Sequence, residues 1–394
     1  MKRRDFIKYT SLMAAGTLCP NVFARRPGRN SPRLILIELK GGNDGLNTLV
    51  PYKNPDYKRI RKKIHLEAKD VNVINERLGL GLHNKLQFMH SQFEKKQVAI
   101  FHSVGYESPN MSHFRGIDIW DTAVDSAAAK STGWIAEALK GDVGTSAKSK
   151  GIILGDHNLG PLRGTKQSIL VVDNIKKMLR SRKLFEEHED RKNPALNHIL
   201  EIENQVLEQL NDLSQINFEP KKKSGFQADI NILLQLVKAR PEIPFYKLSL
   251  GSFDTHAAQL NRHANLLGTF DNGLKTLVEG LRSLNAWDDT LILTYSEFGR
   301  RPMENGNQGT DHGTASCHFA LGGKVKGAIY HGADGNDKGG KAGLGAYDLA
   351  AIKSTNQNLT AKMDFKDIYE TVLTKWWKTR SLGSDRKAID FLKV

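Results

Sequence analysis

Cysteine is scarce in this chain of 394 residues, which has only Cys19 and Cys317. Because no Cys-x-x-Cys pair is present, the sequence argues against a zinc site built from thiolates. If Cys19 is removed with an N-terminal signal, one cysteine remains and no internal disulfide can form. The mature chain would then be stabilised by its core alone.

Long apolar segments and an excess of acidic residues are also missing. No run beyond the N-terminal region is apolar for the length that a membrane-spanning helix requires. The 58 Lys and Arg residues outnumber the 43 Asp and Glu residues, which gives a formal net charge of +15. A basic chain favours anionic partners, such as an anionic small molecule or polysaccharide. No pattern typical of a nucleic-acid-binding module is present, so nucleic acid is not an expected partner.

The first 24 residues, MKRRDFIKYTSLMAAGTLCPNVFA, have the layout of an export signal. A basic start is followed by a short, mildly apolar stretch and by small residues before a possible cleavage site after Ala24. The pair Arg3-Arg4 resembles a twin-arginine signal, and proteins that use this export machinery usually cross the membrane already folded. We therefore expect a periplasmic or extracellular protein. A chance basic N-terminus is the alternative, and lipidation at Cys19 is not favoured because the residue before it is not small.

The rest of the chain alternates short apolar runs with helical patterns. Continuous apolar runs of this length are typical of buried strands in a parallel sheet. We expect strands at 33–39, 97–105, 151–155, 168–172, 245–251 and 290–296. This alternation predicts a single α/β domain over residues 25–394, with a doubly wound, mostly parallel sheet flanked by helices. A charged region near residues 175–225 is expected to be a helical insertion.

The loop after the first expected strand, GGNDGLNT, contains two possible metal ligands. Asp44 and Asn47 lie in a glycine-rich turn, where the backbone can bend sharply and a ligand can approach closely. Both side chains offer oxygen atoms to a cation. The alternative is an ordinary Asn-Asp-Gly turn with no ligand.

The second loop, ESPNMSHFRGIDIW, places Ser112 just before a helical pattern. A hydroxyl at this position could act as a nucleophile or contact a phosphate or sulfate group, since backbone amides at a helix start favour anions. His113 and Arg115 add charge nearby. The alternative is that Ser112 only caps the helix.

The third and fourth loops follow the expected strands at 245–251 and 290–296. The third carries Asp254 and His256, and the fourth carries Glu297, Asp311 and His312. Carboxylates and imidazoles without thiolates suit zinc, manganese, calcium or magnesium. The alternative for Asp254 and His256 is a capping carboxylate beside a surface histidine. Because the carboxyl ends of parallel strands meet at one edge of a sheet, we expect these loops to converge.

Two of these motifs resemble sequences of a known superfamily. The stretch WDDTLILTYSEFGR is similar to a metal-binding stretch of sulfatases and alkaline phosphatases, and LILIELKGGNDG resembles their first metal-binding turn. The chain resembles more closely an exported bacterial family, domain of unknown function 1501. The matching pieces include the twin-arginine start, GGNDGLNT, PNMSHFRGIDIWDTA, FDTH, YSEFGRR, GTDHGTA and DFKDIYETVL.

The resemblance implies an alkaline-phosphatase-like fold with a divalent metal at the strand ends. By position, Asp44 matches the first metal aspartate, and Ser112 falls where the nucleophile-bearing helix begins. The pair Asp254 and His256 falls near the middle motif, and Asp311-His312 resembles the late histidine position. The chain departs from the pattern at Glu297-Phe298, where phosphatases have aspartate and histidine. Ser112 also lacks the sulfatase signature, so formylglycine chemistry is not expected.

Two functions follow as hypotheses. The first is a metal-dependent hydrolase of phosphate or sulfate esters, in which the six carboxylates and histidines of the first, third and fourth loops hold the metal and Arg115 or Arg300 steadies the anionic group. The second is a catalytically inactive envelope protein of the same fold that binds glycan or a protein partner. Convergence of the metal-binding side chains in space is the feature that favours the first.

Overall fold

The computed structural model describes residues 32–140, 149–165, 168–172, 225–331 and 348–394, with isolated positions between 204 and 218. The chain divides into two units, residues 1–30 and 31–394, and the described residues all belong to the second. The expected export signal and nearly all of the expected insertion near 175–225 lie outside the described residues.

A nine-stranded sheet forms the centre of the fold, with β13-β5-β12-β9-β1-β8-β6-β7 as the order of its main path and β14 paired with β5. Its strands are β1 (Arg33–Leu39), β5 (Val98–Gly105), β6 (Ser149–Leu154), β7 (Ser168–Val172), β8 (Phe245–Leu250), β9 (Thr290–Tyr295), β12 (Ser316–Leu321), β13 (Ala328–His331) and β14 (Met363–Asp364). Six of these are the strands expected from the sequence. All of them run parallel except β12, which is antiparallel to both of its neighbours. The predicted mostly parallel sheet flanked by helices is therefore confirmed.

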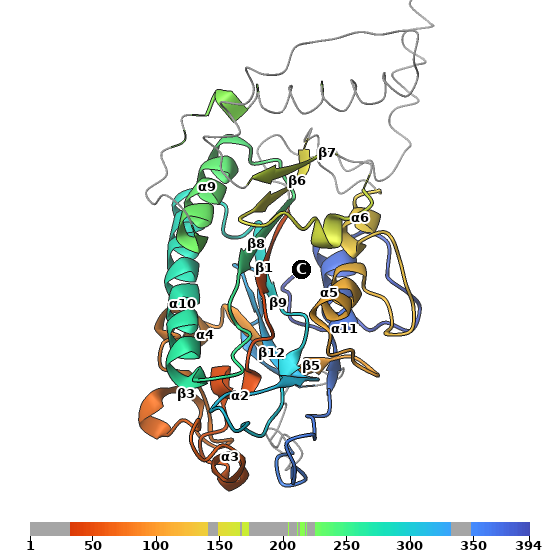
Figure 1. Ribbon diagram of the computed structural model, residues 1–394. Helices are drawn as coiled ribbons and strands as arrows, with labels where there is room; N and C mark the ends of the chain where they lie inside the picture. Colours follow the sequence, from red (N-terminus) through yellow and green to blue (C-terminus); the bar gives the residue numbers. More distant parts are fainter. Residues whose placement is uncertain are drawn as a thin grey trace, which may run out of the picture. The chain divides into compact units, whose positions relative to one another are not determined.

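Helices cover both faces of this sheet. Figure 1 shows α4, α9 and α10 on one side of the sheet and α5, α6 and α11 on the other. The helices are α2 (Gly45–Thr48), α3 (Pro55–Ile60), α4 (Gln87–Glu94), α5 (His113–Thr122), α6 (Trp134–Ala138), α9 (Phe226–Ala239), α10 (Gln259–Ser283) and α11 (Phe365–Thr371), with shorter turns η2 (Ala68–Asp70), η3 (Gly160–Leu162) and η5 (Val372–Trp376). Two small sheets complete the fold: β2 (Leu49–Val50), β4 (Leu80–His83) and β3 (Val71–Asn75), and the pair β10 (Gly299–Arg300) and β11 (His312–Gly313).

Strand β1 shows why the strands of this sheet are continuous apolar runs in the sequence. Its side chains alternate between two cores: Ile35 and Ile37 pack in the same cluster as the apolar residues of α9 and α10, whereas Leu34 and Leu36 pack with those of α5 and α11. All of its residues are buried. A strand covered on both faces has no solvent-facing side, so polar residues do not alternate along it.

The strand directions bring several loops to one edge of the sheet. Strands β1, β5, β8 and β9 all end there, because they are mutually parallel. Strand β12 runs the opposite way and therefore begins at the same edge, just after β11. The loops that follow four strands and the segment that precedes a fifth consequently meet, as is usual for ligand sites in open α/β sheets.

A buried network of charges lies beneath this edge, on the face covered by α5. The ammonium of Lys247 lies 2.9 Å from the Glu38 carboxylate and 3.1 Å from that of Asp156, and Lys247 and Glu38 are fully buried. Asp121 on α5 accepts a hydrogen bond from the Tyr295 hydroxyl. Burial raises the pKa of Asp121 to about 8. The positive charge of Lys247 opposes this rise, and the negative charge of Glu38 adds to it. The Asp121 carboxyl is therefore protonated at neutral pH.

The protonated Asp121 predicts a dependence of stability on pH. Its pKa rises from 3.8 in a free side chain to about 8 in the fold. Between these values the folded protein binds one more proton than the unfolded chain, so stability falls as the pH rises from about 4 to 8. Between pH 5 and 8, the free energy of unfolding measured with urea should fall less in Asp121→Asn than in wild type. The difference between the two decreases should be at most about 4 kcal/mol. Asp385→Asn, at an exposed position, is the control, and an identical pH dependence in Asp121→Asn and wild type would contradict the assignment.

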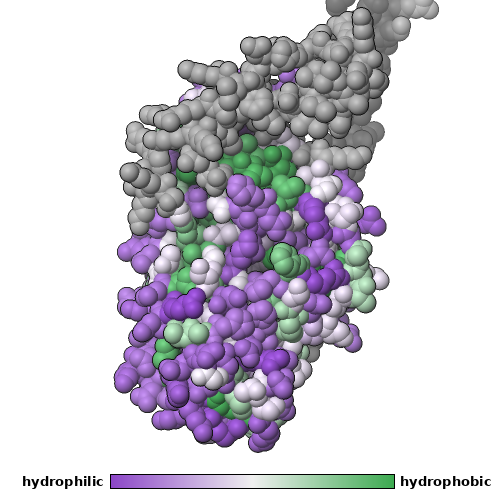
Figure 2. Space-filling model, viewed as in Figure 1, coloured by the Kyte–Doolittle hydropathy of each residue, from purple (hydrophilic) through white to green (hydrophobic). Residues whose placement is uncertain are grey.

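Among the described residues, no helix combines the length and the apolar character needed to cross a membrane. Most of the described surface visible in Figure 2 is hydrophilic, in agreement with the 26% of charged residues in the chain.

Candidate metal centre

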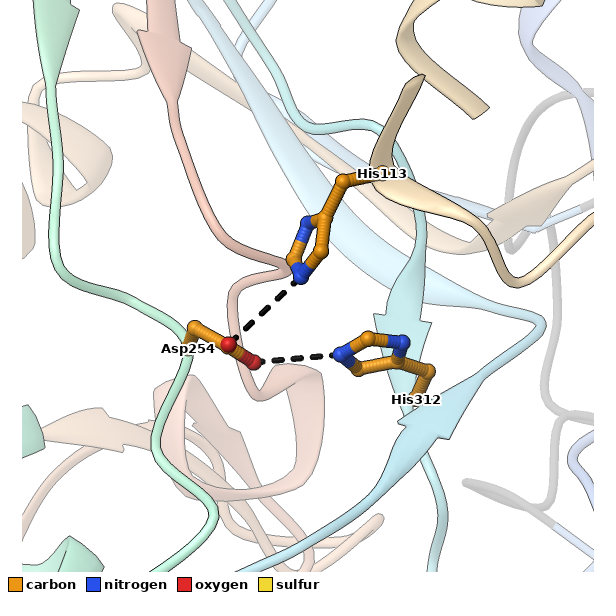
Figure 3. A group of neighbouring side chains, drawn as sticks. All are labelled: His113, Asp254 and His312. Atoms are coloured by element: carbon orange, nitrogen blue, oxygen red, sulfur yellow. Dashed lines mark hydrogen bonds and ion pairs between the residues drawn. The ribbon is translucent and has the colours of Figure 1, made fainter. Parts of the chain in front are cut away.

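Three histidines surround the Asp254 carboxylate at the carboxyl edge of the sheet. The Nε2 atoms of His256 and His312 lie 3.0 and 3.1 Å from Asp254 Oδ1, and Nε2 of His113 lies 3.5 Å from Oδ2. Figure 3 shows His113 and His312 pointing toward Asp254 from separate segments of the chain. His256 Nε2 and His312 Nε2 are only 3.1 Å apart. The ligand atoms of His113, Asp254 and His312 all lie within 4.8 Å of one another.

The opposite nitrogen of each histidine is held by an oxygen acceptor. Nδ1 of His113 lies 2.7 Å from Glu297 Oε1, and Nδ1 of His256 lies 3.2 Å from Asp311 Oδ1. Nδ1 of His312 donates to the carbonyl oxygen of Met111 at 2.8 Å. Because carboxylates and carbonyls accept hydrogen bonds, all three imidazoles can carry their proton on Nδ1, which is the tautomer that a metal ion at Nε2 requires. Each Nε2 then presents a lone pair toward Asp254.

This arrangement fits a divalent cation. Nitrogen lone pairs of His256 and His312 face each other and a carboxylate oxygen, and a positive ion between them removes the repulsion. The three separations of 3.0, 3.1 and 3.1 Å approach the spacing of about 3.3 Å between ligands of an ion bound tetrahedrally at about 2.0–2.1 Å. Histidine ligands with carboxylate or carbonyl partners on the outer nitrogen are usual in metal sites. Imidazole-rich donors suit zinc or manganese better than calcium or magnesium, which prefer oxygen atoms.

Unusual backbone conformations place Asp254 and His256. Gly41 has φ of +115°, and a Cβ atom there would lie 2.4 Å from the backbone nitrogen of Asp254, so only glycine allows this approach. Ser252 and Ala258, on either side of the pair, have positive φ values of 78° and 46°. Non-glycine residues adopt this region at a cost, and such positions are concentrated at functional sites.

Charges around the site set the protonation states. Burial favours the neutral form of Asp254, but the hydrogen bond and charge of Arg300 outweigh it and lower the pKa of Asp254 to about 2. Burial likewise opposes ionisation of Asp311, and hydrogen bonds from Asn305 and His256 overcome it and lower the pKa of Asp311. Both carboxylates are thus negative at neutral pH and able to attract a cation.

The histidines differ from one another in protonation. The hydrogen bond to Glu297 raises the pKa of His113, although partial burial opposes this shift. Burial lowers the pKa of His312, only partly offset by its bond to the Met111 carbonyl. His312 is therefore neutral, and available as a ligand, over a wider range of pH than His113.

Glu297 orients His113 from inside the fold. Its carboxylate is buried and accepts hydrogen bonds from the backbone N–H of Gly41 and from His113. The following residue, Phe298, packs its ring 4.9 Å from that of His113 and 4.4 Å from that of His312. Of the ligands expected in the fourth loop, His312 faces Asp254 directly, whereas Glu297 and Asp311 hold histidines that do so.

The structure places Asp44 and Asn47 outside this group. Asp44 is buried and caps α2, and both of its oxygens contact the Arg61 guanidinium, at 2.5 and 3.0 Å. Asn47 accepts hydrogen bonds from Arg61 and Tyr57 and donates to the Ile64 carbonyl. Arg61 thus supplies the positive charge that was expected from a metal ion at this loop.

The expected catalytic residues occupy three different environments. Ser112 is the exposed residue before α5, its side chain makes no capping hydrogen bond, and it directly precedes His113. The Arg115 guanidinium contacts Asp118 and donates to the carbonyls of Ser126 and Ala128. The Arg300 guanidinium is buried and donates to four backbone carbonyls and to Asp254, so it is engaged within the fold and is not presented to a substrate.

Two residues of the site were not expected from the sequence in these roles. The sequence indicates His113 only as a charge near Ser112, and it gives no role to Asn305, which donates to Asp311 Oδ1 and to the His256 carbonyl. The place of His113 at the start of a helix that follows a strand was a usable signal, because that position lies at the carboxyl edge of the sheet. Nothing in the local sequence distinguishes Asn305.

The site is open to solvent. The side chains of Asp254, His256 and Asp311 are 41–43% exposed, and that of His113 is 39% exposed. A ligand can therefore approach the ion-binding atoms without a change in the described structure.

Fold and site together define an α/β protein with a histidine- and aspartate-rich cluster at the carboxyl edge of its sheet. The family described as "Protein of unknown function (DUF1501)" matches residues 102–389, nearly three quarters of the chain. The chain belongs to this family. None of the curated protein sequences compared with it matches.

Several solved structures are loosely similar to the chain. Lipoteichoic acid synthase LtaP from Listeria monocytogenes aligns with a TM-score of 0.39 and 10% identity, over 92% of this chain and 75% of its own. A protein of the alkaline phosphatase superfamily from Vibrio parahaemolyticus gives 0.37 and 11%, over 76% and 62%. The periplasmic domain of EcEptC from Escherichia coli, in complex with Zn, gives 0.38 and 9%, over 75% and 73%. At this level of similarity, neither residue correspondences nor activities follow from these structures.

The cluster predicts binding of a divalent ion that depends on its histidines. We expect the purified chain to bind Zn²⁺, and His256→Ala and His312→Ala to weaken this binding more than about 100-fold. Glu297→Gln and Asp311→Asn should weaken it about 10- to 100-fold, because they remove the carboxylates that orient histidines. Titration calorimetry with Zn²⁺ measures these affinities.

His65→Ala is the matched control for the metal titration. His65 contacts the Arg61 carbonyl and is not part of the cluster, so its removal should leave the affinity unchanged. Zn²⁺ affinity that is the same in wild type and His312→Ala would rule out the centre described here.

The Asp44–Arg61 pair predicts a different outcome for the first loop. Asp44→Ala leaves a buried guanidinium without its carboxylate and should lower the free energy of unfolding by about 3–5 kcal/mol. Because Asp44 does not face the histidines, the folded variant should keep its Zn²⁺ affinity within a few-fold of wild type. Urea unfolding and the same Zn²⁺ titration test both points, with Asp44→Ala/Arg61→Met expected to regain part of the stability. A large loss of Zn²⁺ affinity in folded Asp44→Ala would instead make Asp44 a ligand.

Proposed function

We propose that this protein is an exported, metal-dependent hydrolase of phosphate or sulfate esters. The observation that carries the proposal is the set of three imidazoles whose Nε2 atoms face one carboxylate, with each Nδ1 bonded to an oxygen acceptor. Such a donor set suits a divalent ion of the zinc or manganese type. An ion of this kind, when bound, polarises an ester oxygen and activates water.

Each residue of the site has a distinct part in this proposal. His256, His312 and Asp254 bind the ion, and His113 completes the ligand set or contacts the anionic group from the same side. Glu297, Asp311 and the Met111 carbonyl hold the imidazoles in the orientation that the ion requires. Arg300 keeps Asp254 ionised.

Ser112 is the proposed nucleophile or anion contact. Its hydroxyl is exposed, is not used as a helix cap, and belongs to the residue next to His113. Backbone N–H groups at the start of α5 favour an anion at this position. The open site and the net charge of +15 also suit an anionic small molecule or polysaccharide as substrate.

A non-catalytic protein that uses the same ion to bind a glycan or a protein partner is the second candidate. Two observations favour it. The Asp44 carboxylate is paired with Arg61, and Phe298, a side chain that cannot bind a metal ion, packs against the rings of His113 and His312. The described residues therefore show one cluster of metal-type ligands, not two.

Residues 1–24 remain the proposed twin-arginine signal, and a periplasmic or extracellular location is part of the proposal. Export in the folded state would allow the ion to be bound before the protein crosses the membrane. Fractionation of cells that express the full chain and an Arg3→Lys/Arg4→Lys variant tests this point: only the variant should be retained in the cytoplasm.

Ester hydrolysis is tested with 4-nitrophenyl phosphate and 4-nitrophenyl sulfate. The Zn²⁺- or Mn²⁺-loaded wild type should hydrolyse at least one of them, and chelation should abolish the reaction. We expect His312→Ala to lower kcat/KM more than about 100-fold through loss of the ion, and Ser112→Ala to lower kcat while the ion stays bound. His65→Ala again serves as the control. A wild type that binds the ion stoichiometrically but hydrolyses neither ester would favour the binding protein.

A further inference from the structure

The side chain of Gln259 is fully buried where the third and fourth loops meet. Gln259 is the first residue of α10, and its amide oxygen accepts hydrogen bonds from the hydroxyls of Thr310 at 2.6 Å and Thr255 at 3.0 Å. Its amide nitrogen donates to the Asp44 carboxylate. Glutamine is mostly an exposed residue, and it is tolerated in a core when its polar atoms are bonded, as both ends of this amide are.

The two threonines belong to the loops that supply the ion-binding atoms. Thr255 lies between Asp254 and His256, and Thr310 lies two residues before His312. The Nε2 atoms of His256 and His312 are 3.1 Å apart although they come from different loops. Their separation therefore depends on how the two loops are held against each other, and a shift at either threonine moves a histidine of the same loop.

The backbones of the two loops also approach each other closely here. The N–H of Thr310 donates to the Thr255 carbonyl at 3.2 Å, and the N–H of Gln259 donates to the Gln308 carbonyl at 2.9 Å. A Cβ atom at Gly309 would lie 2.2 Å from the carbonyl carbon of His256. The amide of Gln259 thus bonds to both loops at the point where they are in contact.

The Asp44 carboxylate fixes the orientation of the Gln259 amide. Burial opposes ionisation of Asp44, but the charge and hydrogen bonds of Arg61 outweigh it and lower the pKa of Asp44. An ionised carboxylate only accepts hydrogen bonds, so the NH₂ group faces Asp44 and the amide oxygen faces the threonines. Without Asp44 the amide can turn and donate to the same hydroxyls, so the contact between the loops is made by Gln259 itself.

We propose that Gln259 is a positioning residue of the candidate metal centre, which holds the third and fourth loops at the separation at which His256 and His312 share one ion. The inference rests on the ion-binding part of the proposed function and does not depend on ester hydrolysis. The bonds of Gln259 go to the two threonines and to Asp44, so it acts on the ion through the loops. Residues that orient metal ligands in this way usually contribute about 10- to 100-fold to affinity.

Titration of the full chain with Co²⁺ tests this role, because the visible absorption of bound Co²⁺ depends on the geometry of its ligands. Gln259→Leu removes the polar atoms of the amide and should weaken Co²⁺ binding about 10- to 100-fold and change the absorption of each bound ion. Thr310→Val, which keeps the shape of the side chain and removes its hydroxyl, should weaken binding about 3- to 10-fold. Thr310→Ser keeps the hydroxyl and should have the affinity and spectrum of wild type.

Thr290→Val is the matched control, because Thr290 is also a fully buried threonine with two hydrogen bonds. Its hydroxyl accepts from Arg33 and donates to the Ala286 carbonyl at the start of β9, the opposite end of the strand from the cluster. Thr290→Val should lower stability and leave Co²⁺ affinity and spectrum unchanged. If Gln259 only stabilises the fold, folded Gln259→Leu and Thr310→Val will behave as this control does, which would overturn the proposal.

The ion titration and the ester assay separate this inference from hydrolysis. A wild type that binds Co²⁺ through Gln259 but hydrolyses neither 4-nitrophenyl ester would support the positioning role and contradict hydrolysis. A wild type that hydrolyses an ester, with Co²⁺ affinity and spectrum unchanged in Gln259→Leu and Thr310→Val, would support hydrolysis and contradict the positioning role. A wild type that binds no Co²⁺ would overturn both.

Discussion

The geometry of the candidate metal centre depends on one buried guanidinium, that of Arg300. It donates to the carbonyls of Gly41 and Gly42 after β1, of Phe253 after β8 and of Thr310 before β11, and it also contacts Asp254. These carbonyls lie beyond the ends of the strands, where the hydrogen-bond ladder of the sheet does not provide donors. Because buried carbonyls require hydrogen-bond donors, another group must supply them. Arginine can serve several of them at once, since its planar group carries five N–H donors. The strand directions bring these loops to one edge, and this side chain holds them together there.

The same guanidinium explains the electrostatics of the site. Its charge keeps Asp254 ionised despite partial burial, so a negative oxygen lies among three imidazoles. Glu297 and Asp311 offer acceptors to the imidazole protons on the outer nitrogens of His113 and His256. Negative charge and lone pairs are thereby concentrated toward the interior of the cluster, where a cation is the natural complement.

In the first loop, a carboxylate at the end of a strand stabilises the fold, because the chain itself supplies the cation as the Arg61 guanidinium. Asp44 follows a strand and a glycine turn, as a metal ligand would, yet Arg61 contacts both of its oxygens. The Asp44 carboxylate and Arg61 are buried together, and burial of a pair is tolerated only when both charges are compensated. Arg61 thus engages both oxygens of Asp44, whereas Arg300 contacts Asp254 at Oδ1 and the three histidines also face that carboxylate.

Much of this protein could be predicted from its sequence, and the limits have a physical reason. Six strands, the parallel character of the sheet and the loops that carry Asp254, His256, Asp311 and His312 were predicted, because hydrophobic periodicity and the ends of apolar runs are properties of short segments. The antiparallel direction of β12 was not predicted, since a single apolar run does not reveal the direction of its neighbours.

Only the tertiary structure determines which role each carboxylate of the site has. The carboxylates that each hold one histidine and the carboxylate that faces all three histidines are alike in sequence. They differ only in which partner lies within about 3 Å of them, and those partners come from distant parts of the chain: Arg61 for Asp44, His113 for Glu297 and Arg300 for Asp254. The local sequence shows which loops carry carboxylates and imidazoles. Folding decided which of their side chains are paired and which remain available to a metal ion, because charge compensation depends on distances in space and not on order along the chain.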